Sequence, residues 1–311
     1  MAISRASIAK ELLTGLNAVF GLEYGEVNNE HEALFEVENS DRAFEEEVMF
    51  TGFATAPVKG EGSAVSYDTA QETYVSRYTN ETVALAFAVT EEAMEDNLYD
   101  TFSKLRARGL ARAMANTKQV KAADVFNNGF STAPSYIGGD GAAFFSASHP
   151  TVSDGIQSNL AAAADLSEAA LETIITSVQK IKDDRNILIG ANAVSLHIPP
   201  DLWSTADQIL HSPGTTIAGG TGDGTYAQNN INAIRHMGMI PEGFMVNRRF
   251  TDVNAYFIKT DVPNGAKMFV RVPLQTKMEP DFDTGNLRFK ARERYSFGFS
   301  DWRSYVGSQG T

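Results

Sequence analysis

The chain has 311 residues, enough to bury one large core or two ordinary ones. It contains no cysteine, which excludes disulfides, thiol catalysis and cysteine-ligated metals. The N-terminal residues have no long apolar run, and no stretch reaches the ~20 apolar residues that span a bilayer. We therefore expect a cytoplasmic protein with no membrane partner.

The net charge of −13 is distributed unevenly along the chain. Residues 1–100 hold 20 acidic and 5 basic residues, a net charge of −15, whereas residues 101–200 and 201–311 each carry a net charge of +1. The acidic third is expected either to meet complementary surfaces or to form a solvated face that keeps the protein soluble. The sequence leaves both interpretations open.

The first 82 residues predict little core. Residues 1–20 predict a short helix, because apolar residues recur near helical spacing at Ile8, Leu12, Leu13, Leu16 and Phe20. Residues 21–50 are acidic with aromatic islands. Residues 51–82 begin with glycines and a proline and continue into the β-prone segment 73–79, which predicts a two-stranded projection that must lie on another surface.

A strand and a long helix are predicted next. Residues 83–89 alternate large apolar with small side chains, which predicts a closely covered strand. Residues 90–126 give the longest helical signal, and Thr90 is the expected cap. The helix is expected to bury one apolar stripe, formed by Met94, Leu98, Phe102, Leu105 and Val120.

The rest of the chain reads as mixed helices and strands. A helix is predicted from Ser167 to about Lys182, with Leu166 and Leu171 as a hydrophobic staple. A strand (194–198), a proline-started helix (200–210) and a Gly/Thr/Asn-rich loop (212–232) follow. The last predicted strands are 243–247, 255–260, 267–272 and 287–299, with a turn at 263–265.

Motifs of catalytic sites are absent from the sequence. There is no Walker loop, dinucleotide fingerprint, H-E-x-x-H or G-x-S-x-G, and the glycine run at 219–224 is interpreted as a flexible loop. A single Asp283-Thr284-Gly285 lacks the second carboxylate of an aspartic protease and favours a turn. Ser146, Ser148 and His149 favour a turn before Pro150 over a triad. We predict no enzyme, cofactor or metal site.

Two basic tracts are the candidate functional residues. The first, in the long helix, spans a segment without acidic residues before Asp124 and comprises Lys104, Arg106, Arg108, Arg112, Lys118 and Lys121. The second lies on one face of the last long strand and comprises Arg288, Lys290, Arg292 and Arg294. Each tract is expected to contact a neighbouring subunit or a phosphate backbone, or to form a solvated face. For the strand tract we favour the contact between subunits.

Three segments of the sequence carry a family resemblance. Residues 144–150 (FFSASHP) resemble the Phe-Ser-x-x-His-Pro segment of the Mu-like major head subunits of tailed bacteriophages. A second segment of the same proteins is similar to residues 198–202 (IPPDL) together with Ala206 and residues 209–212 (ILHS). The ending Asp301-Trp302-Arg303 resembles the close of many such proteins. The order of the predicted elements also resembles the Hong Kong 97-type fold of tailed-phage major capsid proteins.

This resemblance implies an α+β fold with an N-arm (1–50), a β-hairpin E-loop (51–82), a peripheral domain with a spine helix (83–160 and 266–311) and an axial domain (161–265). It implies a major capsid protein that assembles in the bacterial cytoplasm through hexamers and pentamers into an icosahedral virion shell around double-stranded DNA. A separate scaffolding protein, a portal and decoration proteins are the implied partners. Some family members crosslink an E-loop lysine to a neighbour, for which Lys59 is the only candidate in 51–82.

Three other functions stay open on sequence alone. An encapsulin-like compartment would have the same fold with a protein cargo. A hydrolase with an unrecognised site in 161–265 would need a matched nucleophile, base or metal set, which the motifs do not supply. A monomeric acidic binding module would leave the predicted projection uncovered.

Overall fold

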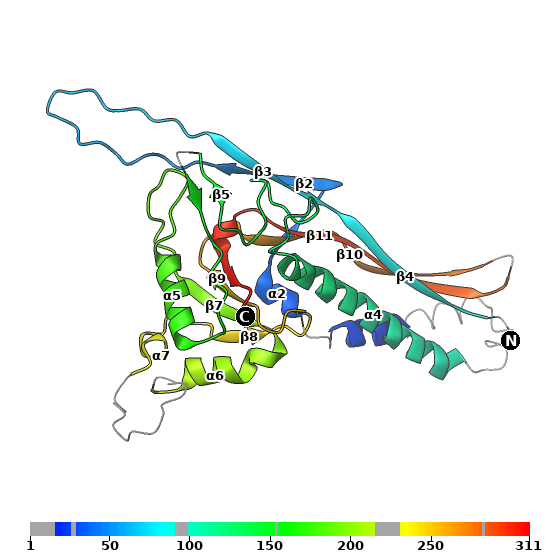
Figure 1. Ribbon diagram of the computed structural model, residues 1–311. Coiled ribbons are helices and arrows are strands. Elements are labelled where there is room, and N and C mark those ends of the chain that lie inside the picture. Colours follow the sequence, from blue (N-terminus) through cyan, green and yellow to red (C-terminus); the bar gives the residue numbers. More distant parts are fainter. Residues whose placement is uncertain are drawn as a thin grey trace, which may run out of the picture.

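The computed structural model describes residues 16–25, 29–90, 92, 99–152, 155–214, 231–281 and 284–311. The molecule is elongated, and three parts can be followed in Figure 1. A hairpin projects at one end, a sheet with one long helix extends at the other, and a compact α/β region lies below the root of the hairpin. This mixture of helices and strands confirms the predicted α+β class.

The extended sheet has the order β1-β10-β11-β4. Strand β1 (Glu36–Asn39) pairs in parallel with β10 (Ala266–Pro280), and β10, β11 (Leu287–Phe299) and β4 (Glu81–Val89) are antiparallel. The predicted bounds of β11 are confirmed. Strand β10 runs eight residues past its predicted end, because it continues to pair with β11 beyond two irregularities in register.

Strand β4 is less covered than its alternating pattern predicted. Val83 and Phe87 pack beneath the sheet, but Leu85 on the same side is about half exposed. The small residues Ala84, Ala86 and Ala88 are exposed on the other side. The prediction of a closely covered strand was therefore wrong within one subunit, since no element of the described chain lies on the alanine side.

The long helix, α4 (Tyr99–Asn127), buries a different face from the predicted one. Leu105 and Val120 of the predicted stripe are exposed, while Met94, Leu98 and the Phe102 side chain lie outside the description. The buried face is built largely of small residues, namely Ala107, Ala111, Ala115, Ala122 and Ala123, together with Leu110, Met114 and Phe126. Small side chains let the helix axis approach the sheet closely, so counting large apolar residues selected the wrong side.

The N-terminal segment packs on this layer. Residues 16–25 are helical, and Leu16 and Phe20 are buried with Phe289 and Ala291 of β11 and with the small-residue face of α4. The other residues of the predicted helix, Ile8, Leu12 and Leu13, lie outside the described chain. Helix α2 (Glu30–Leu34) follows and leads into β1.

The compact region is built on the sheet β12-β9-β7-β8. Its strands are β7 (Ala193–Ile198), β8 (Phe244–Val246), β9 (Tyr256–Thr260) and β12 (Tyr305–Ser308). Helices α5 (Glu168–Gln179), α6 (Trp203–His211) and α7 (Ala233–Met237) surround it, with short 3-10 turns at Pro200–Leu202 and Trp302–Ser304. Residues 215–230, most of the predicted loop, lie outside the described chain.

Local signals in this region are confirmed. The Ser167 hydroxyl accepts a hydrogen bond from the Ala170 amide at the start of α5, as expected of an N-cap, and both staple residues, Leu166 and Leu171, are buried. Asn264 adopts a positive φ of 59° in the turn between β9 and β10. The proline-started helix begins as a 3-10 turn at Pro200 and continues as α6.

The projection is the hairpin of β2 (Phe44–Phe50) and β3 (Glu72–Thr79). Its first strand precedes the predicted boundary at residue 51, because the alternation Phe44, Glu46, Val48, Phe50 was hidden in an acidic run. Residues 51–71 between the strands contain no regular strand. A second two-stranded piece, β5 (His149–Pro150) with β6 (Ile156–Gln157), lies near the hairpin root.

Candidate assembly surfaces

The helix tract contains one buried ion pair. The Lys118 Nζ lies 2.6 Å from Glu293 of β11, and their side chains are only 15% and 1% exposed. The Tyr24 hydroxyl donates to the same carboxylate at 3.2 Å, and burial, followed by the charge of Glu293, raises the pKa of Tyr24 far above its ordinary value. Lys118 therefore belongs to the core and is withdrawn from the candidate surface residues.

Three other residues of the helix tract also pair inside the subunit. Arg108 and Arg112 both contact Glu23 of the N-terminal helical segment, and Lys121 contacts Glu81 of β4. Lys104 and Arg106 are exposed in the first half of α4. The tract is therefore partly neutralised by its own chain, although the arginine side chains stay largely exposed.

Other acidic residues of the first 100 also form ion pairs within the subunit. Glu30 contacts Arg248 and Arg249 at 3.2 and 3.0 Å, and Glu38 and Glu47 hold the buried Lys267 at 2.8 and 2.5 Å. Burial alone would lower the pKa of Lys267, but its hydrogen bonds to these two carboxylates raise it. Much of the charge asymmetry is therefore resolved within one subunit. Within one subunit, Glu23 and Glu81 of the acidic third reach part of the helix tract.

The strand tract remains on an open surface. Arg288, Lys290 and Arg292 are exposed on the face of β11 that points away from α4, beside the alanine side of β4. Arg288 contacts Asp281, and Arg294 donates to the Asn80 carbonyl at 3.3 Å. Within the described chain, Lys290 and Arg292 make no ion pair or hydrogen bond. We call this surface, formed by the strand tract and Ala84, Ala86 and Ala88, the basic sheet face.

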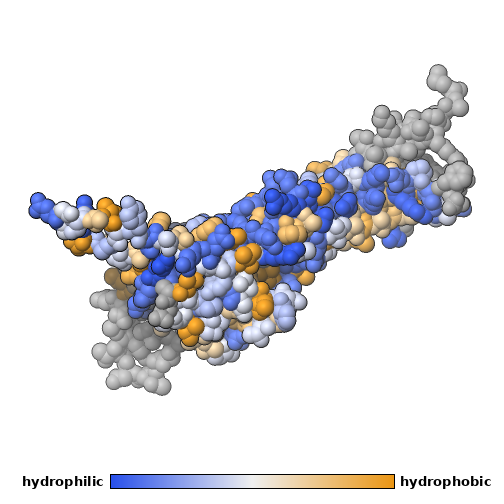
Figure 2. Space-filling model, turned by 90° about the horizontal axis from the view of Figure 1, so that it is seen from above, coloured by the Kyte–Doolittle hydropathy of each residue, from blue (hydrophilic) through white to orange (hydrophobic). Residues whose placement is uncertain are grey.

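The projecting loop 51–71 exposes large apolar side chains. They are Phe53, Val58, Val65 and Tyr67. Figure 2 shows hydrophobic residues on this projecting end, beyond the hydrophilic surface of the central part. Near the root of the loop, the Asp68 carboxylate accepts from the Ala54 amide at 2.7 Å, and Arg185 donates to the Thr69 carbonyl at 2.8 Å. Lys59 lies in the exposed part of the loop.

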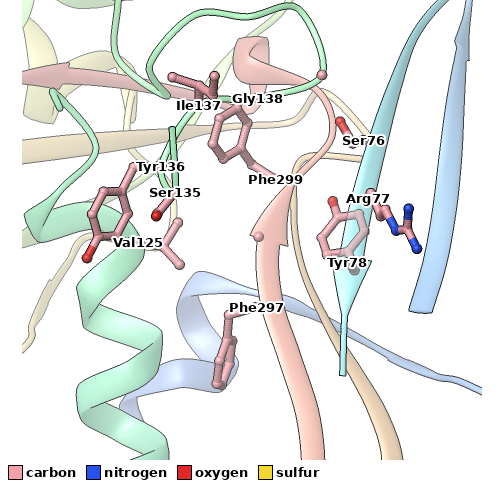
Figure 3. A pocket seen from close by; sticks show the side chains of 12 residues that line it. Ser76, Arg77, Tyr78, Val125, Ser135, Tyr136, Ile137, Gly138, Phe297 and Phe299 are labelled. Carbon is pink, nitrogen blue, oxygen red and sulfur yellow. The ribbon is translucent and has the colours of Figure 1, made fainter. Parts of the chain in front are cut away.

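A cavity of about 130 Å³ lies where the hairpin root meets β11 and the loop after α4. Figure 3 shows Tyr78, Tyr136, Phe297 and Phe299 among its lining side chains. Three glycines allow close approach here: a Cβ on Gly139 would lie 2.5 Å from the Val75 carbonyl oxygen, and Gly138 and Gly298 are similarly confined. The cavity is smaller than the ~300 Å³ of typical ligand sites and holds no paired acid and base.

The His149 side chain is fully buried and held by polar and stacking contacts. Its Nδ1 lies 2.6 Å from Asp140, its Nε2 lies 3.0 Å from the Asn159 side-chain oxygen, and its ring stacks on Trp302. The Asn159 amide nitrogen in turn donates to the carbonyls of Phe144, Trp302 and Tyr305. These contacts join two of the segments that carried the family resemblance, 144–150 and 301–303.

The third residue of the C-terminal segment, Arg303, is also buried. It donates to Asp184 at 2.7 Å and to Asp301 at 3.3 Å, and burial raises the pKa of Asp301. The same guanidinium donates to the Lys182 carbonyl, one residue before the loop that carries Arg185. Arg303, positioned by Asp301, therefore holds the segment whose Arg185 contacts the projecting loop.

A second close pair of catalytic residue types is also closed to solvent. The Ser195 hydroxyl lies 3.0 Å from His197 Nε2, but both residues are almost completely buried in β7. Burial lowers the pKa of His197 to about 3, which makes the ring a weak base. No group of three or more metal-ligating side chains occurs among the described residues, and none of their helices has the length and hydropathy of a membrane span.

The comparisons with known proteins agree with this geometry. A family model described as phage capsid protein matches residues 73–307. No curated protein gives a significant sequence match. Among solved structures, the virus-like particle from Pyrococcus furiosus is similar at 10% identity and a TM-score of 0.56, covering 96% of this chain and 99% of the other. The capsid of a native GTA particle is similar at 14% identity and a TM-score of 0.56, with coverages of 90% and 89%. The procapsid of bacteriophage JBD30 is similar at 14% identity and a TM-score of 0.52, with coverages of 98% and 76%.

Proposed function

Because the chain belongs to the phage capsid protein family, we propose that its subunits assemble through hexamers and pentamers into an icosahedral head that encloses double-stranded DNA. The protein is a structural subunit of a virion capsid with the Hong Kong 97-type fold. The observation that supports assembly most directly is the projecting loop 51–71, whose apolar side chains no part of the described subunit covers. A projecting loop with uncovered apolar side chains gains its stability from a neighbour.

In this proposal, residues 1–50 form the N-arm, whose last strand β2 (Phe44–Phe50) pairs with β3 of the E-loop, and residues 51–82 form the E-loop. Residues 83–160 and 266–311 form the peripheral domain, with α4 as its spine helix. Residues 161–265 form the axial domain, which meets its copies at the centre of each hexamer or pentamer. The subunit has no enzymatic role and uses no cofactor.

The basic sheet face receives the projecting loop of a neighbouring subunit. The exposed alanines of this face leave room for the large apolar side chains of the neighbour's loop. Its cations lie opposite two exposed acidic residues of the neighbour, Glu61 in the loop and Glu72 at the start of β3. Each exposed charge pair contributes only about 0.2–1 kcal/mol, but a ring of subunits repeats every pair. If such a contact includes a covalent crosslink between subunits, Lys59 is the lysine that forms it. A single monomer band on denaturing gels of mature particles would exclude the crosslink.

Assembly takes place in the bacterial cytoplasm, with a separate scaffolding protein, a portal and decoration proteins as partners. An encapsulin-like compartment is the alternative, because the similarity to the Pyrococcus furiosus particle shows the fold and leaves the cargo open. Electron microscopy of the purified protein tests the proposal: closed shells or hexameric and pentameric rings are expected. A monomer under all salt conditions would contradict it, and shells filled with protein instead of nuclease-resistant DNA would favour the alternative.

A further inference from the structure

Four arginines share two buried carboxylates on the α4 side of the molecule. Arg108 and Arg112 of α4 contact Glu23 from the N-terminal helical segment. Two arginines from the loop after β8, Arg248 and Arg249, contact Glu30 at the start of α2. Each group of one glutamate and two arginines keeps a net charge of +1.

The burial within these groups is one-sided. The Glu23 and Glu30 side chains are 12% and 5% exposed, whereas those of Arg108, Arg112 and Arg248 are 58%, 71% and 67% exposed; Arg249 is only 20% exposed and links the two groups. The carboxylates therefore lie beneath the guanidinium groups and position them from below. A guanidinium has five N–H donors, so an arginine held by one carboxylate still presents donors to solvent.

The two groups join into one surface. The Arg249 Nη2 donates to the side-chain oxygen of Asn116 at 3.3 Å, and Asn116 lies one helical turn after Arg112. From Arg108 to Asn116 the helix rises about 12 Å. We call this surface, formed by Arg108, Arg112, Asn116, Arg248 and Arg249, the arginine ridge.

We propose that the arginine ridge binds the phosphate backbone of the double-stranded DNA inside the shell, an inference that rests on the proposed function. Guanidinium groups bind phosphate oxygens in pairs of parallel hydrogen bonds, and groups already held in place lose less freedom on binding. DNA carries one charge per ~1.7 Å, so the ridge faces several phosphates.

The test is the salt dependence of DNA binding by the purified full-length protein, with a mixed-sequence double-stranded fragment as the probe. The variant R112S/R248S removes one arginine from each group and leaves Arg108 and Arg249 to pair with the two carboxylates. Each lost phosphate contact reduces the slope of log K against log salt by about 0.9, so a slope shallower by about 2 is expected. The variant R112K/R248K keeps the charge and should restore most of the slope.

A matched control is K180S/R235S, which removes two exposed charges away from the ridge. An unchanged slope in R112S/R248S with an unchanged melting temperature would overturn the proposal, as would an equal loss in the control. Binding of polyglutamate as tight as that of DNA, with the same loss in R112S/R248S, would reassign the ridge to an acidic protein. Shell formation, scored separately by electron microscopy, tests the proposed function, so failure of the two ideas is distinguishable.

Discussion

The buried pair between Lys118 and Glu293 makes the sharpest stability prediction. In the variant K118M, the Glu293 carboxylate stays 1% exposed and loses the cation 2.6 Å away. Of its two oxygens, one already has no hydrogen-bond partner within the described chain, and the other keeps only the Tyr24 hydroxyl. Removing one partner of a buried ion pair costs about 3–5 kcal/mol, a large share of the 5–15 kcal/mol that stabilises a typical domain.

Urea unfolding of unassembled subunits measures this loss. Trp302 is buried beside the core aromatics and reports unfolding by its fluorescence. The control variant K121M breaks an exposed pair of the same helix, with Glu81, and should lose no more than about 0.2–1 kcal/mol. The slope of free energy against urea should stay constant, so that the shift in midpoint reports stability alone.

The double variant K118M/E293L tests the cause. Replacing both members of a buried pair by apolar side chains is often nearly neutral, so the double variant should regain most of the stability lost in K118M. A loss below about 1 kcal/mol in K118M, or a double variant that is simply the sum of the two single ones, would refute the description of this pair as a desolvated unit.

Three further predictions follow from the fold and the proposed contacts. Burial lowers the pKa of His197 from 6.5 to about 3, so folding favours the neutral ring. The free energy of unfolding should therefore be intact above pH 6.5 and fall as the pH drops toward 3, by about 2 kcal/mol at pH 5. Urea titrations above pH 6.5 and at pH 5 measure this loss, which the variant H197Q should lack. Deleting residues 55–67 removes Val58, Val65 and Tyr67 from the exposed part of the loop and should give folded subunits, by circular dichroism, that close no shells in electron micrographs; normal shells would show that the loop is dispensable. Reversing the charge of the strand tract should block assembly of empty shells, and high salt should slow wild-type assembly, since exposed charges are screened within ~8–10 Å; a salt-insensitive empty shell would exclude this role for Arg288, Lys290, Arg292 and Arg294.

Strict local periodicity made part of the fold predictable. The alternation of β11 gave its bounds, and the cap at Ser167 gave the start of α5. The buried face of α4 was missed because its contact with the sheet uses alanines, which carry little weight in an apolar pattern. The strand β2 was missed because three consecutive glutamates cover its alternation.

The sequence did not separate buried from exposed members of the basic tracts, because local patterns do not show which residues meet in the fold. Lys118 resembled its basic neighbours in sequence, and the signal that sets it apart is Glu293, the one acidic residue on the apolar face of β11. The arginine ridge was half visible, through Arg108 and Arg112. Arg248 and Arg249 join it only because the loop after β8 and helix α2 meet beside α4, a contact that no local pattern encodes.

The glycines at the hairpin root give the projection the mechanics of a lever. From Val75 to the middle of the loop is about 15 residues, or roughly 50 Å of extended chain, so a rotation of about 5° at the root moves the far end by about 4 Å. A methyl group on Gly139 would press on the Val75 carbonyl at this pivot. Because a closed shell repeats the same subunit, such a displacement would recur at every copy. A single added methyl group at Gly139 would therefore shift the projecting loop of every subunit relative to its neighbour.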